Sequence, residues 1–220
     1  RGFYKFPKFE PKPFLGEFRA DPEENPLGTP SGKIEIYSSA IAGFNYEDCP
    51  GHPVWQEPLE WLGSELTEKY PLHLITNQPK TRLHSQYDNG GYSKEHKIND
   101  REPVTINPID AANREITEGD IVRLFNDRGA CLAGAQVSDD VMPGVIQLST
   151  GAWFDPLEPG TTGSLDVHGN PNVLTMDKGT SSLAQGPSAM TALVDVERFK
   201  GDPPPVKIFS PPEVILEESL

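Results

Sequence analysis

Short apolar runs separated by turn residues dominate the chain between residues 70 and 199. Most of these runs are too short for an ordinary helix and end near proline, glycine or asparagine, which is typical of β-strands. Such short strands, broken by polar loops, predict a mainly β fold with short helices, a small barrel rather than a doubly wound sheet. The segments predicted to be strands are 70–76, 102–108, the two arms of a hairpin within 121–141, 142–150 and 192–199.

Turn and cap residues locate the hairpin and one helix. The sequence NDRG at 126–129 separates the two apolar arms, and we expect Gly129 to take the positive φ of a tight turn. Residues 107–116 predict a short helix that is capped by Asn107, with Pro108 at its first position. Two further elements are predicted, a short helix within 58–70 and a half-exposed strand over 32–39.

The composition changes at both ends of the chain and divides it into three segments. Residues 1–40 are predicted to be an extended N-terminal arm with a connecting strand, residues 41–199 a β-barrel domain, and residues 200–220 a Pro-rich tail. The chain does not begin with Met, so we expect it to be a piece of a longer protein. The arm carries too many aromatic side chains for a free tail, and we expect them to lie on another surface: Phe3, Tyr4, Phe6, Phe9, Phe14 and Phe18.

Charge and cysteine content exclude several classes of function. The formal net charge is −14 and there is no basic run, so we expect no nucleic-acid partner. No stretch approaches the roughly 20 apolar residues of a membrane span, so we expect no membrane insertion, and no signal peptide is visible. Cys49 and Cys131 lack metal-ligand spacing. Cys131 lies in an apolar run, which predicts a buried thiol, and we do not expect a disulfide.

Two long polar loops, 76–86 and 167–186, carry the candidate chemistry. Most of their polar side chains both donate and accept hydrogen bonds, which suits a heterocycle such as a pterin or guanine. Lys80 and Arg82, together with backbone amides, suit a phosphate group. The other candidate residues in the two loops are Asn77, Gln78, His84, Ser85, Gln86, His168, Asn170, Asn172, Thr180, Ser181 and Gln185.

Other interpretations of these loops remain open. They can be solvated connections, with His84 and His168 as ordinary hydrogen-bonded histidines, and with Asn170 and its neighbours only capping turns. The barrel can also be a cofactor-free module that binds a protein or peptide, although such a module does not need so many amides at both loops. A small hydrolase using Ser85 and His84 is disfavoured, because adjacent residues rarely point at each other and no third group orients them.

Ordered blocks of sequence extend through most of the chain. They are PLGTPSGKIEIYS, DCPGHPVW, YPLHLIT, PKTRLHSQ, REPVTINPIDAANREITEGDIVRLFNDRGACLAGA, PGVIQLSTGAWFDP and HGNPNVLTMDKGTSSLAQG. Over residues 19–199 these blocks resemble the C-terminal part of the dimethyl sulfoxide reductase family of molybdopterin oxidoreductases. The resemblance is strongest to the branch of trimethylamine N-oxide, dimethyl sulfoxide and biotin sulfoxide reductases. So many blocks in order are more specific than any single motif.

The resemblance implies a double-psi β-barrel that packs on the remaining catalytic domains of the same enzyme. It implies binding of bis(molybdopterin guanine dinucleotide), which holds molybdenum, with no catalytic residue or metal ligand in this chain. The intact enzyme would reduce an S-oxide or N-oxide with electrons from a redox partner, in the periplasm or, alternatively, the cytoplasm. Family members often carry another residue at the position of Gln78. The implied cofactor-binding residues are Thr76, Asn77, Gln78, Arg82, Leu83, His84, Ser85, His168, Asn170, Asn172, Gln185 and Gly186.

Overall fold

The computed structural model describes residues 2–188 and 190–211 of the chain. These residues fall into two compact units. The first comprises Arg1–Gln56 with Ser181–Leu183, and the second comprises Glu57–Thr180 with Ala184–Leu220. Part of the predicted Pro-rich tail, residues 212–220, lies outside the described residues. Across the part of the chain that is described, every helix is too short or too polar to cross a membrane.

The first unit contains two short helices, α1 (Gly16–Ala20) and α2 (Ser39–Ala42). Ser38 caps α2, because its hydroxyl accepts a hydrogen bond from the N–H of Ile41 at 3.3 Å. The strand predicted over 32–39 is wrong. Ile34 and Ile36 are 70% and 76% exposed, and no neighbouring strand among the described residues pairs with this segment.

Aromatic side chains of the N-terminal arm are exposed to solvent. Phe3, Tyr4, Phe6, Phe9 and Phe14 each have at least 75% of their surface accessible. Their predicted contact with another surface stays a prediction.

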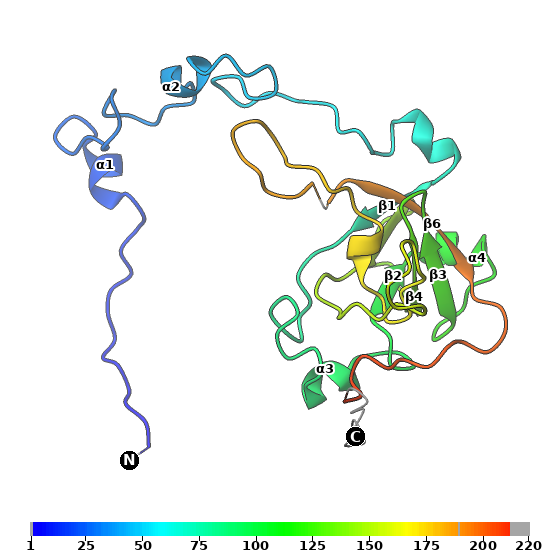
Figure 1. Ribbon diagram of the computed structural model, residues 1–220. Helices are drawn as coiled ribbons and strands as arrows, with labels where there is room; N and C mark the ends of the chain where they lie inside the picture. Colours follow the sequence, from blue (N-terminus) through cyan, green and yellow to red (C-terminus); the bar gives the residue numbers. More distant parts are fainter. Residues whose placement is uncertain (1, 189, 212–220) are drawn as a thin grey trace, which may run out of the picture. The chain divides into compact units, whose positions relative to one another are not determined.

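The second unit is a closed barrel of six strands (Figure 1). The order around the barrel is β1-β5-β2-β4-β3-β6, with parallel pairs β1–β5 and β2–β4 and antiparallel pairs elsewhere. Every predicted strand from residue 70 onward is confirmed, as is the mainly β class with short helices and a barrel of the expected double-psi type. The bounds are β1 (Leu72–Ile75), β2 (Pro103–Ile106), β3 (Ile121–Phe125), β4 (Ala130–Val137), β5 (Val145–Leu148) and β6 (Ala192–Arg198).

Alternating side chains from the six strands fill the barrel. Leu74 on β1 lies in register with Ile146 on β5, and Val104 on β2 lies in register with Ala135 on β4; all four are fully buried. Closure leaves no free edge among these strands, so the backbone hydrogen bonds of the sheet are satisfied within the barrel. The predicted buried thiol, Cys131, is confirmed on β4 with 0% exposure, and neither cysteine forms a disulfide.

Short helices connect the strands. The predicted helix after β2 is confirmed as α4 (Pro108–Ala112), and the N–H of Ile109 donates to the Asn107 side chain at 2.9 Å. The helix predicted within 58–70 is only the single 3₁₀ turn η1 (Glu65–Glu68). The remaining elements, α3 (Gly91–Glu95) and η2 (Pro171–Val173), were not predicted.

Gly129 in the hairpin turn corrects one expectation. Its φ lies outside the left-handed region, so the turn does not need glycine for its conformation. A Cβ atom at this position would instead lie 2.9 Å from the carbonyl oxygen of Val173. The glycine is therefore required by the close approach of the loop that carries η2.

Residues 200–211 lie against the barrel and end beside α3 (Figure 1). The N–H groups of Lys207 and Ile208 donate to one carboxylate oxygen of Asp155 at 2.6 and 3.0 Å. The ring of Phe209 lies 4.9 Å from the ring of His168 and 5.7 Å from that of Trp153. The described part of the tail is thus tied to the loops that follow β5.

Candidate functional site

The loop that follows β1 is held in shape by its own side chains. The side-chain oxygen of Gln78 accepts from the N–H of His84 at 2.9 Å, and the Gln78 amide nitrogen lies 2.8 Å from His84 Nδ1. His84 and Tyr87 both have positive φ values, 49° and 59°. Such values are uncommon for residues other than glycine, so the surrounding contacts must hold the loop in this conformation.

Gly151 allows this loop to approach the segment that follows β5. A Cβ atom on Gly151 would lie 2.0 Å from the carbonyl oxygen of His84, and the φ of Gly151 is +93°. Both the space and the backbone conformation therefore require glycine. The N–H of Thr150 also donates to the Asn77 carbonyl at 3.1 Å, so two adjacent residues attach this segment to the loop.

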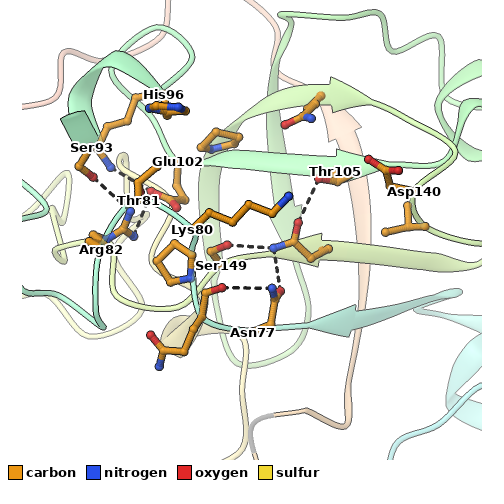
Figure 2. A pocket seen from close by; sticks show the side chains of 17 residues that line it. Asn77, Lys80, Thr81, Arg82, Ser93, His96, Glu102, Thr105, Asp140 and Ser149 are labelled. Atoms are coloured by element: carbon orange, nitrogen blue, oxygen red, sulfur yellow. Dashed lines mark hydrogen bonds and ion pairs between the residues drawn. The ribbon is translucent and has the colours of Figure 1, made fainter. Parts of the chain in front are cut away.

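A cavity of about 510 Å³ opens beside this loop and the ends of β2, β4 and β5 (Figure 2). Its wall carries a network of neutral amides and hydroxyls. The Gln147 amide donates to the Asn77 side chain at 2.8 Å and to the Ser149 hydroxyl at 2.9 Å, and it accepts from Thr105 at 3.0 Å. Gln147 was missed from the sequence, although it is the polar position in the otherwise apolar strand VIQL.

A second cavity, of about 420 Å³, brings the two predicted loops together. His84 and Ser85 line it from the first loop, and Asn170 and Asn172 line it from the second. Asn170 also caps η2, because its side chain accepts from the N–H of Asn172 at 2.9 Å. Consecutive residues after β5 line the two cavities, Ser149 the first and Thr150 the second.

The other predicted residues lie outside these two cavities. Thr76 is buried, and its hydroxyl lies 3.3 Å from the sulfur of Met190. Leu83 is 59% exposed. Gln185 and Gly186 are exposed and line neither cavity. Their contact with a cofactor stays a prediction.

Arg82 lies in a buried cluster of charges. Its guanidinium contacts Asp88 at 3.3 Å and Glu102 at 3.2 Å, and Lys97 contacts the same two carboxylates, each at 2.9 Å. The four side chains are at most 4% exposed. Arg82 also donates to the backbone carbonyls of His84 at 3.1 Å and Thr150 at 3.2 Å. The two cations and the two carboxylates balance each other, so the cluster carries no net charge. Through its bonds to His84 and Thr150, the Arg82 guanidinium ties the loop after β1 to the segment after β5.

Asp88 carries a lowered pKa within this cluster. Burial alone would raise it, but the hydrogen bonds from Lys97 and from the N–H of Trp153, and the charges of Lys97 and Arg82, outweigh burial. Asp88 is therefore ionised at neutral pH. Its contribution to stability is present above the unfolded-state pKa and is lost as the pH falls through the folded-state value.

His168 does not line the second cavity. Its side chain is fully buried, Nδ1 lies 2.8 Å from the carbonyl oxygen of Trp153, and Nε2 has no hydrogen-bond partner among the described residues. Burial and the charge of Lys97 lower its pKa, and the bond to Trp153 and the charges of Asp88 and Glu102 offset this only in part. His168 is thus neutral at pH 7, and Nδ1 donates to the carbonyl.

Asp166 organises the backbone around His168. Its carboxylate accepts hydrogen bonds from the N–H groups of Asp155, Gly169 and Asn170 at 2.7–2.8 Å. Its side chain is fully buried, and burial raises its pKa despite these bonds. This carboxylate, which the sequence did not single out, sets the position from which Asn170 enters the second cavity.

Comparison with known proteins identifies the class of this domain. The family model described as "Molydopterin dinucleotide binding domain" matches residues 72–193, which include β1 to β5 and the first two residues of β6. The chain belongs to this family. The predicted molybdopterin dinucleotide-binding domain is thereby confirmed.

Several curated proteins have sequences similar to this chain. The chain is 50% identical to the dimethyl sulfoxide/trimethylamine N-oxide reductase of Cereibacter sphaeroides over 96% of its own length, and 53% identical to trimethylamine-N-oxide reductase 1 of Escherichia coli (strain K12) over 84%. It spans only 26% and 22% of those proteins. Among solved structures, acetylene hydratase from Pelobacter acetylenicus has the same fold over 81% of this chain and 25% of its own, with a TM-score of 0.64 at 22% identity.

Proposed function

We propose that this domain binds bis(molybdopterin guanine dinucleotide) in a molybdenum oxidoreductase that reduces S-oxides or N-oxides. One observation carries the proposal: two polar loops, distant in sequence, meet at the second cavity, which is lined by His84, Ser85, Asn170 and Asn172, while amides line the first cavity. The relatives named dimethyl sulfoxide and trimethylamine-N-oxide reductase support the substrate class.

The donor groups of the two cavities fit such a cofactor. Asn77, Gln147 and Ser149 offer neutral donors and acceptors, which match ring N–H, carbonyl and amino groups of pterin and guanine. The close approach at Gly151 brings the backbone of His84 and Ser85 to the rim of the second cavity. We assign to direct contact the cavity-lining members of the predicted set other than the buried Arg82, namely Asn77, Gln78, His84, Ser85, Asn170 and Asn172.

The chemistry and the protein environment have separate roles in this proposal. When bound, the cofactor supplies a molybdenum centre, held by dithiolene sulfurs, that exchanges an oxygen atom and two electrons with the substrate. The residues of this chain bind and orient the organic part of the cofactor and exclude water from it. We also propose that this domain packs on the remaining domains of the same enzyme and that the enzyme receives electrons from a redox partner. Its proposed location is the periplasm, with the cytoplasm as the alternative.

The test is to produce the full-length protein that contains this chain in a host that makes molybdenum cofactor. Molybdenum and GMP released by hydrolysis are measured per polypeptide, and reduction of trimethylamine N-oxide and dimethyl sulfoxide is followed with a reduced dye. We expect GMP and molybdenum in the ratio of a bis-dinucleotide cofactor, together with reductase activity. A folded protein that contains neither would refute the proposal and favour the cofactor-free binding module.

A further inference from the structure

The first cavity is lined by three cationic side chains, and two of them are already neutralised. Arg82 and Lys97 are 1% and 2% exposed, and both contact Asp88 and Glu102 at 2.9–3.3 Å. An anion that approached Arg82 would compete with carboxylates that are buried and fixed. This cluster therefore offers no net attraction to a phosphate.

Lys80 is the third cation, and its surroundings differ. Its side chain is exposed and forms no ion pair with any described residue. Figure 2 shows it extended into the cavity, with Ser149 on one side and Thr105 ahead of it. The other ionisable groups lining the cavity are Glu102, which is paired with Arg82 and Lys97, and His96 and Asp140, and Asp140 lies on the far side of the cavity from Arg82 in this view.

We infer that Lys80 is the residue that binds the anionic diphosphate group of the dinucleotide, and that Arg82 is a positioning residue that fixes the loop carrying Lys80. The inference rests on the function proposed above. A lysine ammonium binds phosphate as a point charge with three donors, which suits a side chain on a flexible stem at the mouth of a cavity. Arg82 uses its donors on Asp88, Glu102 and the carbonyls of His84 and Thr150.

The test compares Lys80→Gln and Lys80→Arg in the full-length protein, with Lys200→Gln as a matched control. Lys200 is also an exposed lysine of the barrel unit, but it lines neither cavity. The purified proteins are dialysed at low and at high sodium chloride, and the GMP and molybdenum that remain bound are measured against time. Urea unfolding of each variant shows whether the fold is unchanged.

We expect Lys80→Gln to lose the dinucleotide about tenfold faster than wild type, equivalent to about 1.4 kcal/mol, and with a weaker dependence on salt. Lys80→Arg should largely restore retention, and Lys200→Gln should behave as wild type. If wild type contains cofactor and Lys80→Gln retains it equally well, the role of Lys80 is refuted while the proposed function stands. If wild type contains neither molybdenum nor GMP, the proposed function itself fails.

Discussion

Replacing Asp88 by Asn should strongly destabilise the barrel, because it unbalances the buried charge cluster. Asp88 is fully buried and lies 2.9 Å from Lys97 and 3.3 Å from Arg82. After the substitution both cations share the single carboxylate of Glu102, and one positive charge is left without a counter-charge. Removing one member of a buried ion pair costs about 3–5 kcal/mol. That is a large share of the roughly 5–15 kcal/mol by which domains are stable.

The assay is urea unfolding of the 220-residue chain, followed by tryptophan fluorescence. The matched control is Glu197→Gln, which breaks the ion pair of Glu197 with Arg123 at 3.0 Å. These side chains are 56% and 38% exposed, so the control should cost less than about 1 kcal/mol. Trp153 lies next to the cluster, since its backbone N–H donates to Asp88 at 2.9 Å, and its fluorescence should report the change.

A double substitution separates charge balance from other effects of the mutation. Asp88→Asn combined with Lys97→Met leaves Arg82 and Glu102 as a balanced pair 3.2 Å apart. We expect the double variant to be more stable than the sum of the two single losses, by about 1–3 kcal/mol. Strictly additive losses, or an Asp88→Asn variant within about 1 kcal/mol of wild type, would show that the cluster is not the stabilising unit described here.

Three further predictions follow from individual contacts. Gly151→Ala should cost more than about 2 kcal/mol in urea unfolding, whereas Gly163→Ala, with a φ of +76° but no neighbouring atom, should cost only about 1 kcal/mol; equal losses would contradict the close contact with His84. Because the pKa of His168 is lowered in the folded protein, its contribution to stability is complete above the unfolded-state pKa and is lost as the pH falls through the folded-state pKa. His168→Asn should therefore weaken the decline in urea midpoint between about pH 7.5 and about pH 5.5. An unchanged decline would exclude this histidine as its source. Phe209→Ala should speed amide hydrogen exchange at Lys207 and Ile208, because the ring anchors the tail on His168; unchanged exchange would show that the bonds to Asp155 suffice.

The barrel could be predicted from the sequence because its signals are local. Each strand from residue 70 onward is a short apolar run, and the cap at Asn107 needs only its own neighbours. The strand predicted over 32–39 fails for a related reason. Alternation of Ile34 and Ile36 with charged residues describes one face of a strand, but a strand also needs a partner for its backbone, and alternation does not supply one.

The charge cluster could not be predicted, because its members lie in polar stretches and resemble solvated loop residues. Asp88, Lys97 and Glu102 lie among other polar residues such as EHKINDRE, which is a typical exposed sequence. Their burial arises only when β2 pairs with β4 and β5 and α3 packs beside them. The sequence singles out Arg82 as a phosphate ligand because of its charge. In the fold, that charge is instead paired with the carboxylates of Asp88 and Glu102.

The balanced cluster also bears on how a chain of net charge −14 can receive an anionic ligand. A cavity lined by unpaired carboxylates would repel a diphosphate over a distance of about 8–10 Å at physiological salt. Here Glu102 is neutralised by Arg82 and Lys97, and most of the remaining wall consists of neutral amides and hydroxyls. Asp140, the other carboxylate in the lining, lies on the far side of the cavity from Arg82 in Figure 2, so the exposed ammonium of Lys80 supplies the cationic donor for a diphosphate, and the buried cluster keeps the loop that carries Lys80 in place.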